Sequence, residues 1–222
     1  MADHYLGDAA VVKGNLLLPR IGAWTAEVWL AGNEAPAVGT QTTLTVAGTD
    51  RAATVIASSS DYLQAKCRVV AGAGKLQAEI QAKDYRGYIA PDVVRDILTE
   101  AGETPGSWIQ VSNLQVQTWQ RVRGPCRSAL QRFLRLVTGD TVWRVFDDGT
   151  VNSVNDAFDV TGTSQTFAEL ASWGQERLLL LGVQDSVIRP GDAVEAFGQD
   201  RRLDRCLYEF DEDNFKLWAW YL

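Results

Sequence analysis

One stretch, from Gly124 to Asn152, combines a helix with a hairpin and constrains the fold more than any other part of the chain. Pro125 suits the first helical position, and Gly139 can end the helix because it adopts a left-handed conformation without steric cost. The next run, TVWRVF, is rich in β-branched and aromatic residues, and Asp148-Gly149 predicts a two-residue hairpin turn. The apolar residues of the helix recur at helical spacing, at Cys126, Ala129, Leu130, Phe133, Leu134 and Val137. This pattern predicts a helix that packs its apolar face on a sheet.

Residues 1–90 alternate between apolar and polar positions in the manner of short antiparallel strands. Two segments are expected to turn one face inward, at Trp24, Ala26, Val28 and Leu30 and at Leu63, Ala65, Cys67 and Val69. The runs TTLTV and RAATVI predict a hairpin around residues 47–50, and KLQAEIQAKDY predicts a further strand. Strands of this length and spacing predict an N-terminal β-barrel-like domain, with Cys67 as an inert core thiol.

Residues 91–152 are expected to form a helix, a strand, a second helix and a hairpin. The first helix begins at Pro91, ends at Gly102 and has an apolar face made by Val93, Val94, Ile97, Leu98 and Ala101. Residues 107–122 look extended and polar, and a weak pattern at 155–175 contains one short element near Phe167.

Residues 153–222 are expected to form a C-terminal β domain. ERLLLLGV predicts a buried strand, Pro190-Gly191 a turn, and RRLDRCLYEF with FKLWAWYL a final hairpin around residues 211–214. The predicted fold class is α+β and β-rich, with two small antiparallel β-barrel-like domains and two short bridging helices.

Charge and composition limit the classes of partner. The chain has 222 residues, with 21 Lys and Arg against 28 Asp and Glu, and a formal net charge of −7. A general nucleic-acid-binding protein needs a basic surface for phosphates, so we expect neither sequence-specific nucleic-acid binding nor docking on an acidic membrane. Three widely spaced cysteines and the single histidine, His4, cannot supply a zinc site, and we expect no metal or cofactor.

The N-terminal ten residues lack the pattern of a secretory signal, and no run approaches the ~18 apolar residues of a membrane span. We therefore expect a soluble protein made in a reducing compartment.

Candidate catalytic groups are few. The Gly72–Lys75 segment lacks the spacing of a phosphate-binding loop and is interpreted as a β-turn. Nucleophilic catalysis by Ser or Cys needs a base, and the only histidine, His4, lies in an N-terminal segment that we expect to be mobile. The densest carboxylates, Asp147-Asp148 and the run 211–213, lie in predicted turns, where Asp is favoured for local hydrogen bonds. No catalytic residue is assigned.

The predicted second helix also has a basic side. Arg127, Arg132 and Arg135 lie opposite its apolar face. This side could meet an anion or a carboxylate of a partner, but a solvated helix face is the favoured interpretation.

The order of these motifs resembles tail hub and baseplate proteins of tailed bacteriophages, the group related to the contractile-tail hub and the late-control D proteins. The resemblance rests on VVRDILTEAGE, then CRSALQRFLRLVTGDTVWRVFDDGTV, and a C-terminal part, VIRPGDAVEAFGQDRRLDRCLYEFDEDNFKLWAW. It covers residues 85–222. The C-terminal part departs from the pattern at Tyr208, where a His is common in the family.

The resemblance implies a virion structural protein without catalytic activity. Such hubs assemble as rings, commonly homotrimers, that join the tail tube to the tip or spike, so the implied place is the tail tip or baseplate, after synthesis in the host bacterial cytoplasm.

The terminal strand carries the first candidates for ring contacts because both of its faces are apolar or aromatic. Trp218 and Trp220 share one face with Leu222. The other face carries Phe215, Leu217, Ala219 and Tyr221. The interface candidates are Phe215, Leu217, Trp218, Trp220 and Tyr221. The pattern fits equally a central strand of the chain's own barrel.

Two further classes of function stay open. A carbohydrate- or receptor-binding β-module would use Trp218, Trp220 and Tyr221 as stacking platforms. A carboxylate-based cell-wall hydrolase, the third possibility, would rely on Asp147 or Asp211.

Overall fold

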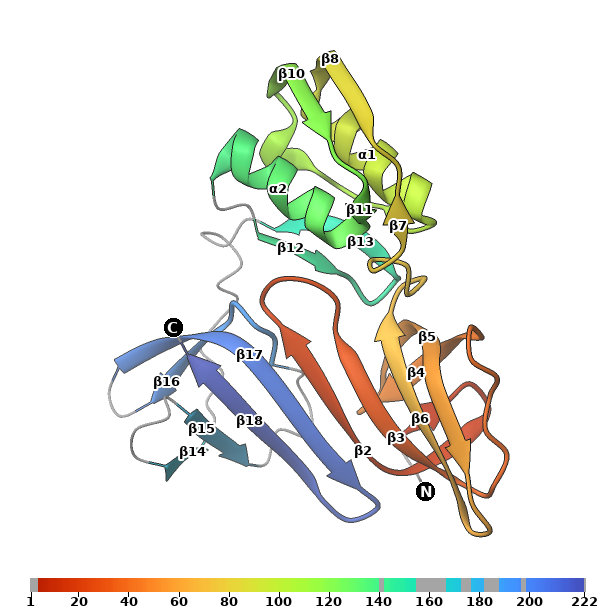
Figure 1. The fold of residues 1–222 in the computed structure, drawn as a ribbon. Coiled ribbons are helices and arrows are strands. Elements are labelled where there is room, and N and C mark those ends of the chain that lie inside the picture. Colours follow the sequence, from red (N-terminus) through yellow and green to blue (C-terminus); the bar gives the residue numbers. More distant parts are fainter. Residues whose placement is uncertain are drawn as a thin grey trace.

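The computed structural model describes residues 4–139, 142–154, 167–172, 177–181, 188–196 and 199–221. Most of its strands form one large antiparallel sheet, and a smaller part with two α-helices lies above that sheet in Figure 1. The described residues are therefore β-rich with two helices, as the α+β prediction expects.

Six N-terminal strands close into an antiparallel barrel. They follow the order β1-β4-β5-β6-β3-β2, and pairing of β1 with β2 closes the ring. The strands are β1 (Tyr5–Leu6), β2 (Ala9–Pro19), β3 (Thr25–Ala31), β4 (Gln41–Val46), β5 (Thr49–Ser60) and β6 (Gln64–Ala71). Alternate side chains fill the interior, and the inward positions predicted along β3 are all buried. The β4–β5 turn is Ala47-Gly48, both with positive φ, as a two-residue hairpin requires.

Two predictions for this region are wrong. Leu63 is not inward but 82% exposed, because it lies in the turn before β6, where the Asp61 carboxylate accepts hydrogen bonds from the backbone N–H groups of Leu63 and Gln64. KLQAEIQAKDY is not one strand of the barrel, although its residues Glu79–Ile80 form β7 and its last three residues begin β8. The barrel strands end at Ala71, and the chain then crosses to the helical part.

Strand β2 connects the barrel to the C-terminal strands. One edge of β2 pairs with β3, and the other pairs first with β1 and then, over Lys13–Pro19, with β17. The sheet continues through β18 and β15 to β14, and β16 pairs with the start of β17. These strands are β14 (Phe167–Ser172), β15 (Arg177–Leu181), β16 (Ala193–Ala196), β17 (Gln199–Asp211) and β18 (Phe215–Tyr221).

The C-terminal strands therefore extend the sheet of the barrel. The predicted final hairpin, β17–β18, is confirmed. Most of the weak pattern at 155–175 lies outside the described residues, apart from β14. A second closed barrel and the domain boundaries at 90 and 152 stay predictions.

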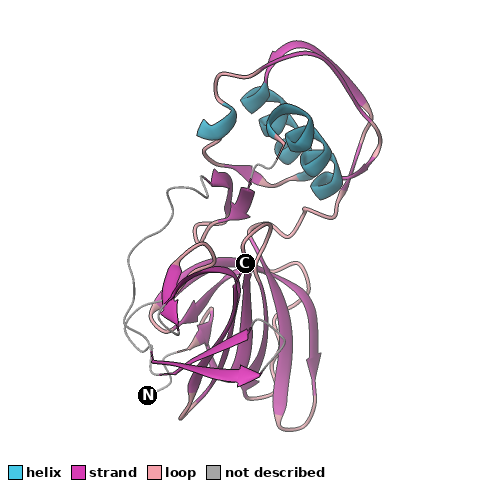
Figure 2. Ribbon diagram, turned by 90° about the vertical axis from the view of Figure 1, so that its left-hand side faces the viewer, coloured by secondary structure: helices cyan, strands magenta, loops and turns pink. Residues whose placement is uncertain are grey.

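The helical part contains α1 (Ala90–Ala101) and α2 (Cys126–Thr138), which pack against each other. Figure 2 shows both helices beneath an arched ribbon of two strands, β8 and β10, and above the barrel. Short strands and a 3₁₀ turn complete this part: β7 (Glu79–Ile80), β8 (Lys83–Ile89), β9 (Thr104–Pro105), η1 (Ile109–Val111), β10 (Gln115–Arg121) and β11 (Gly124–Pro125). The predicted apolar face of α1 is buried in full, and that of α2 is buried except for the half-buried Val137. Pro125 is the N-cap of α2 and not, as predicted, its first helical residue, because the helix begins one residue later, at Cys126.

The hairpin predicted after α2 consists of β12 (Val142–Val145) and β13 (Thr150–Val154). Its loop has three residues, Asp147, Asp148 and Gly149, because the N–H of Phe146 bonds to the carbonyl of Thr150. Gly149 has φ of +83° and closes a turn back to the Phe146 carbonyl. The predicted two-residue turn is wrong by one residue, since a type I turn followed by a left-handed glycine also satisfies the Asp-Gly signal.

Candidate functional site

The interface candidates lie on β18, which runs between β17 and β15. Leu217 is 1% exposed and faces the core, whereas Phe215, Trp218, Trp220 and Tyr221 are half-buried. Both hydrogen-bonding edges of β18 are used inside the sheet, so a contact with another molecule must use its side chains.

The two tryptophans of β18 are held by neighbours on β17. The Trp218 indole Nε1 donates to Glu209 Oε2 at 2.9 Å. The Arg205 guanidinium lies 4.4 Å from the ring centroid of Trp220, a cation–π distance. Both rings are therefore fixed in orientation while part of each surface stays accessible.

His4 is not in a mobile segment, contrary to expectation. Its side chain is buried, its ring centroid lies 4.5 Å from that of Phe210 and 6.2 Å from that of Phe215, and Nδ1 accepts a hydrogen bond from the Ala47 N–H at 3.3 Å. The β1–β2 pairing draws the N-terminal segment into the barrel. His4 is thus part of an aromatic cluster.

The β12–β13 hairpin is the point where barrel, helical part and C-terminal segment meet. The Asp147 carboxylate lies 3.3 Å from Arg51 Nε of β5 and 2.7 Å from Arg189 Nη2 of the C-terminal segment. The backbone carbonyl of Asp147 also accepts from the Ala52 N–H at 2.7 Å. Burial lowers the pKa of Arg51, and the charge of Asp147 opposes that shift. A single acidic residue therefore connects three segments that are far apart in the sequence.

Backbone contacts fix the same hairpin against the β2–β3 loop. Gly22 donates to the Trp143 carbonyl at 2.8 Å and accepts from the Val145 N–H at 3.1 Å. The Arg144 Nη1 donates to the Pro190 carbonyl at 2.7 Å. A pocket of about 400 Å³ opens at this junction, lined by residues of β2, the β2–β3 loop, the hairpin and the segment 189–192.

The glycine-rich loop after β6 binds a carboxylate of the chain itself. Ala73 N and Lys75 N donate to the two oxygens of Glu103 at 3.2 and 2.5 Å. Burial raises the pKa of Glu103, and the backbone hydrogen bonds partly offset this. The loop is thus an anion-binding turn occupied by Glu103, which accounts for its superficial likeness to a phosphate loop.

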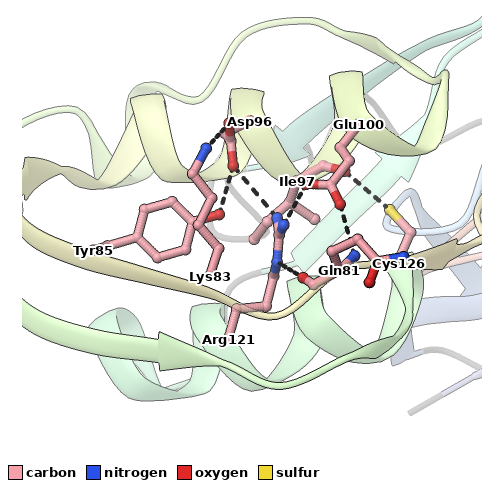
Figure 3. Close-up of polar contacts among 8 residues, drawn as sticks. All are labelled: Gln81, Lys83, Tyr85, Asp96, Ile97, Glu100, Arg121 and Cys126. Atoms are coloured by element: carbon pink, nitrogen blue, oxygen red, sulfur yellow. Dashed lines mark hydrogen bonds and ion pairs between the residues drawn. The ribbon is translucent and has the colours of Figure 1, made fainter.

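An ionic cluster around the buried Arg121 holds the helical part together (Figure 3). Arg121 is fully buried and donates to the Gln81 carbonyl at 2.8 Å, to Asp96 Oδ2 at 3.4 Å and to Glu100 Oε2. The Tyr85 hydroxyl donates to Asp96 Oδ2 at 2.5 Å, and Lys83 Nζ donates to Asp96 Oδ1 at 2.6 Å.

Sequence reasoning missed this cluster. The i,i+4 spacing of Asp96 and Glu100 on α1 was the available signal, but it does not identify the arginine 25 residues from Asp96 that they bind. Burial, together with the hydrogen bond to Asp96, raises the pKa of Tyr85, so its hydroxyl stays protonated as a donor. The cluster braces strands β8 and β10 against α1.

The remaining candidate carboxylates are turn residues, as interpreted from the sequence. Asp148 Oδ1 accepts from the N–H and hydroxyl of Thr150 at 2.9 and 2.7 Å. Asp211 Oδ1 accepts from the N–H groups of Asp213 and Asn214, which lowers the pKa of Asp211. Within the described ranges, no group of three or more His, Cys, Asp or Glu side chains could hold a metal ion.

All three cysteines are buried free thiols. Burial raises the pKa of Cys67, Cys126 and Cys206, that of Cys126 to about 12. The placement of Cys67 on the barrel's inner face is confirmed. Of the helices that the structure describes, neither has the length and apolar character needed to cross a bilayer.

Solved structures with this fold include tail proteins. A 43 kDa tail protein of prophage MuSo2 from Shewanella oneidensis is 9% identical, with 99% of this chain and 96% of that chain covered and a TM-score of 0.74. A tail protein from Neisseria meningitidis MC58 is 9% identical, with 99% and 95% coverage and a TM-score of 0.75.

A third solved structure comes from a secretion system. The E. coli c3393 protein is a component of the type VI secretion system, with structural similarity to the T4 bacteriophage tail proteins gp27 and gp5. It is 11% identical, with 97% of this chain and 75% of that chain covered and a TM-score of 0.67. No protein-family model matches the chain, and no curated protein matches its sequence. The chain thus has a phage tail-type fold.

Proposed function

We propose that this chain is a structural component of a phage-type tail, a hub that assembles into a ring between the tail tube and the distal tip or spike. The observation that carries this proposal is the extent of the fold similarity. Barrel, helical part and C-terminal strands together match the Shewanella and Neisseria tail proteins over at least 95% of both chains. A shared arrangement of all three parts is more specific than a shared barrel alone.

The proposed role is assembly without catalysis. Asp147, one of the acidic residues that line the junction pocket, forms ion pairs with Arg51 and Arg189 and has a connecting role. The partners are further copies of the chain, in a homotrimer as the working stoichiometry, with the tail tube and the tip or spike on either side. The proposed location is the tail tip or baseplate of the virion, after synthesis in the host bacterial cytoplasm.

Within this proposal, the side chains of β18 remain candidates for ring contacts. Trp218 and Trp220 are the most suitable, because they are partly accessible and held in one orientation by Glu209 and Arg205. Leu217 acts from inside the core, where it supports the strand.

Immunogold electron microscopy on particles purified from a host that carries the gene tests the proposal. An antibody against this chain is expected to label one end of the tail. Label spread along the tube, or particles that contain none of the chain, would contradict the hub role. Particles without the chain, combined with a change in tryptophan fluorescence on binding a cell-surface glycan, would favour the carbohydrate-binding alternative.

A further inference from the structure

The outer side of α2 is a basic and partly apolar surface. Arg127, Arg132 and Arg135 are exposed, and Leu136 beside them is 61% exposed. The helix contains no acidic residue. We call these four residues the α2 basic face.

These three arginines differ from six others that the structure describes. Those six form ion pairs with carboxylates: Arg20, Arg51, Arg95, Arg121, Arg123 and Arg189. No hydrogen bond or ion pair joins the three guanidinium groups of the α2 basic face to any residue that the structure describes. Three positive charges beside an exposed leucine therefore form an unpartnered surface on a chain whose net charge is −7.

The complementary charge lies at the opposite end of the molecule. The turn between β17 and β18 carries Asp211, Glu212 and Asp213, all exposed. The Asp211 carboxylate accepts hydrogen bonds from the N–H groups of Asp213 and Asn214 within the turn. The carboxylates of Glu212 and Asp213 pair with no described residue. Figure 1 places α2 in the upper part and this hairpin at the lower edge of the sheet, so a copy cannot bring its own two surfaces together.

We propose that the α2 basic face binds the acidic β17–β18 hairpin of a second copy of this chain. The contact is head-to-tail, because two different surfaces meet, and such a heterologous contact closes into a ring when its rotation allows. Opposite charges orient the approaching copies, and Leu136 supplies apolar surface at the centre of the contact. This inference rests on the proposed ring, and it assigns one contact of that ring, in addition to the β18 candidates, to particular residues.

Charge reversal tests the contact by sedimentation velocity on the full chain. The helix variant carries Arg132→Glu and Arg135→Glu, and the hairpin variant carries Glu212→Arg and Asp213→Arg. Each variant alone is expected to associate at least about tenfold more weakly than the unmodified chain, because like charges then face each other. A single chain that carries all four substitutions is expected to recover association, since every contact between its copies again pairs opposite charges, whatever the number of copies in the ring.

The controls separate this contact from general effects of charge and folding. The variant Arg68→Glu with Arg86→Glu changes the charge by the same amount at exposed sites elsewhere and is expected to associate normally. Arg132→Gln with Arg135→Gln provides a milder change if glutamates near the end of α2 disturb the helix. Circular dichroism melting is expected to show all variants folded.

Several outcomes would overturn the proposal. Unchanged association of both variants would leave the ring intact and remove this contact. A folded chain with all four substitutions that fails to recover association would also remove this contact. A strict monomer at every concentration would remove both the contact and the ring. Binding of duplex DNA that depends on Arg132 and Arg135, with unchanged mass, would assign the face to nucleic acid instead.

Discussion

Removal of the Asp147 carboxylate is expected to destabilise the junction. The Arg51 side chain is 1% exposed, and apart from its hydrogen bond to the Thr49 carbonyl at 3.1 Å, its charge is balanced by Asp147 at 3.3 Å. Asp147→Ala removes the larger of the two carboxylate charges that act on this buried cation and leaves only the weaker effect of Asp50. Breaking a buried ion pair by deleting one partner costs about 3–5 kcal/mol of unfolding free energy.

The expected loss here is smaller than that range. Asp147 is 30% exposed, so water reaches the site, and Arg51 keeps its bond to Thr49. We expect a loss of about 2–3 kcal/mol. For a chain of this length, this corresponds to a fall in Tm of about 5–10 °C.

Urea and thermal unfolding, followed by tryptophan fluorescence, measure this loss. Asp8→Ala is the matched control, because it removes one exposed carboxylate from the β1–β2 turn and is expected to change stability by less than about 0.5 kcal/mol. The double variant Arg51→Met with Asp147→Ala should regain part of the loss, since the buried cation is then gone. If Asp147→Ala were as stable as the control, the assignment of Asp147 as the connecting residue would be refuted.

Three further predictions concern the barrel, the thiols and the helical cluster. Gly14→Ala is expected to lower stability by about 1–3 kcal/mol, because a Cβ would lie 2.8 Å from the Phe210 ring; an unchanged Tm would contradict this packing. A thiol reagent at pH 8 should label no cysteine of the native chain and all three after unfolding, since burial raises each thiol pKa; rapid native labelling would refute the burial. Burial raises the pKa of Asp96, but its bonds to Lys83 and Tyr85 outweigh this and hold the pKa below the usual 3.8. The stability that Asp96 contributes is therefore present at neutral pH and lost as the pH falls below about 3.8. In urea unfolding, Asp96→Asn should be less stable than the unmodified chain at neutral pH, and this difference should shrink below that pH. A difference that stays constant with pH would contradict the assignment.

Features with a local physical cause were predictable from sequence. The apolar face of α1 and its end at Gly102 follow from helical spacing and from the conformational freedom of glycine. The β17–β18 hairpin follows from alternation around an Asp-rich turn. Leu63 shows where this reasoning fails. The Asp61 side chain accepts hydrogen bonds from the backbone N–H groups of Leu63 and Gln64, which places Leu63 in a turn, and the alternating strand begins only after it.

Features that depend on distant pairing were not predictable. The pairing of β2 with β17 joins residues at opposite ends of the chain, and no local pattern specifies it. The same holds for Asp147 with Arg51 and for Glu103 with the loop at Ala73, where each partner alone looks like an ordinary surface residue. For the proposed contact, helical spacing in the sequence predicts the arginine face of α2. Only the structure shows that this face and the acidic hairpin lie at opposite ends of the molecule.

The mass of the purified chain in solution, measured by light scattering over a concentration series, tests the proposed ring most directly. The account predicts a discrete species at a small whole-number multiple of the 24.4 kDa chain, with three copies as the working value. A particle that stays at 24.4 kDa at every concentration would contradict it.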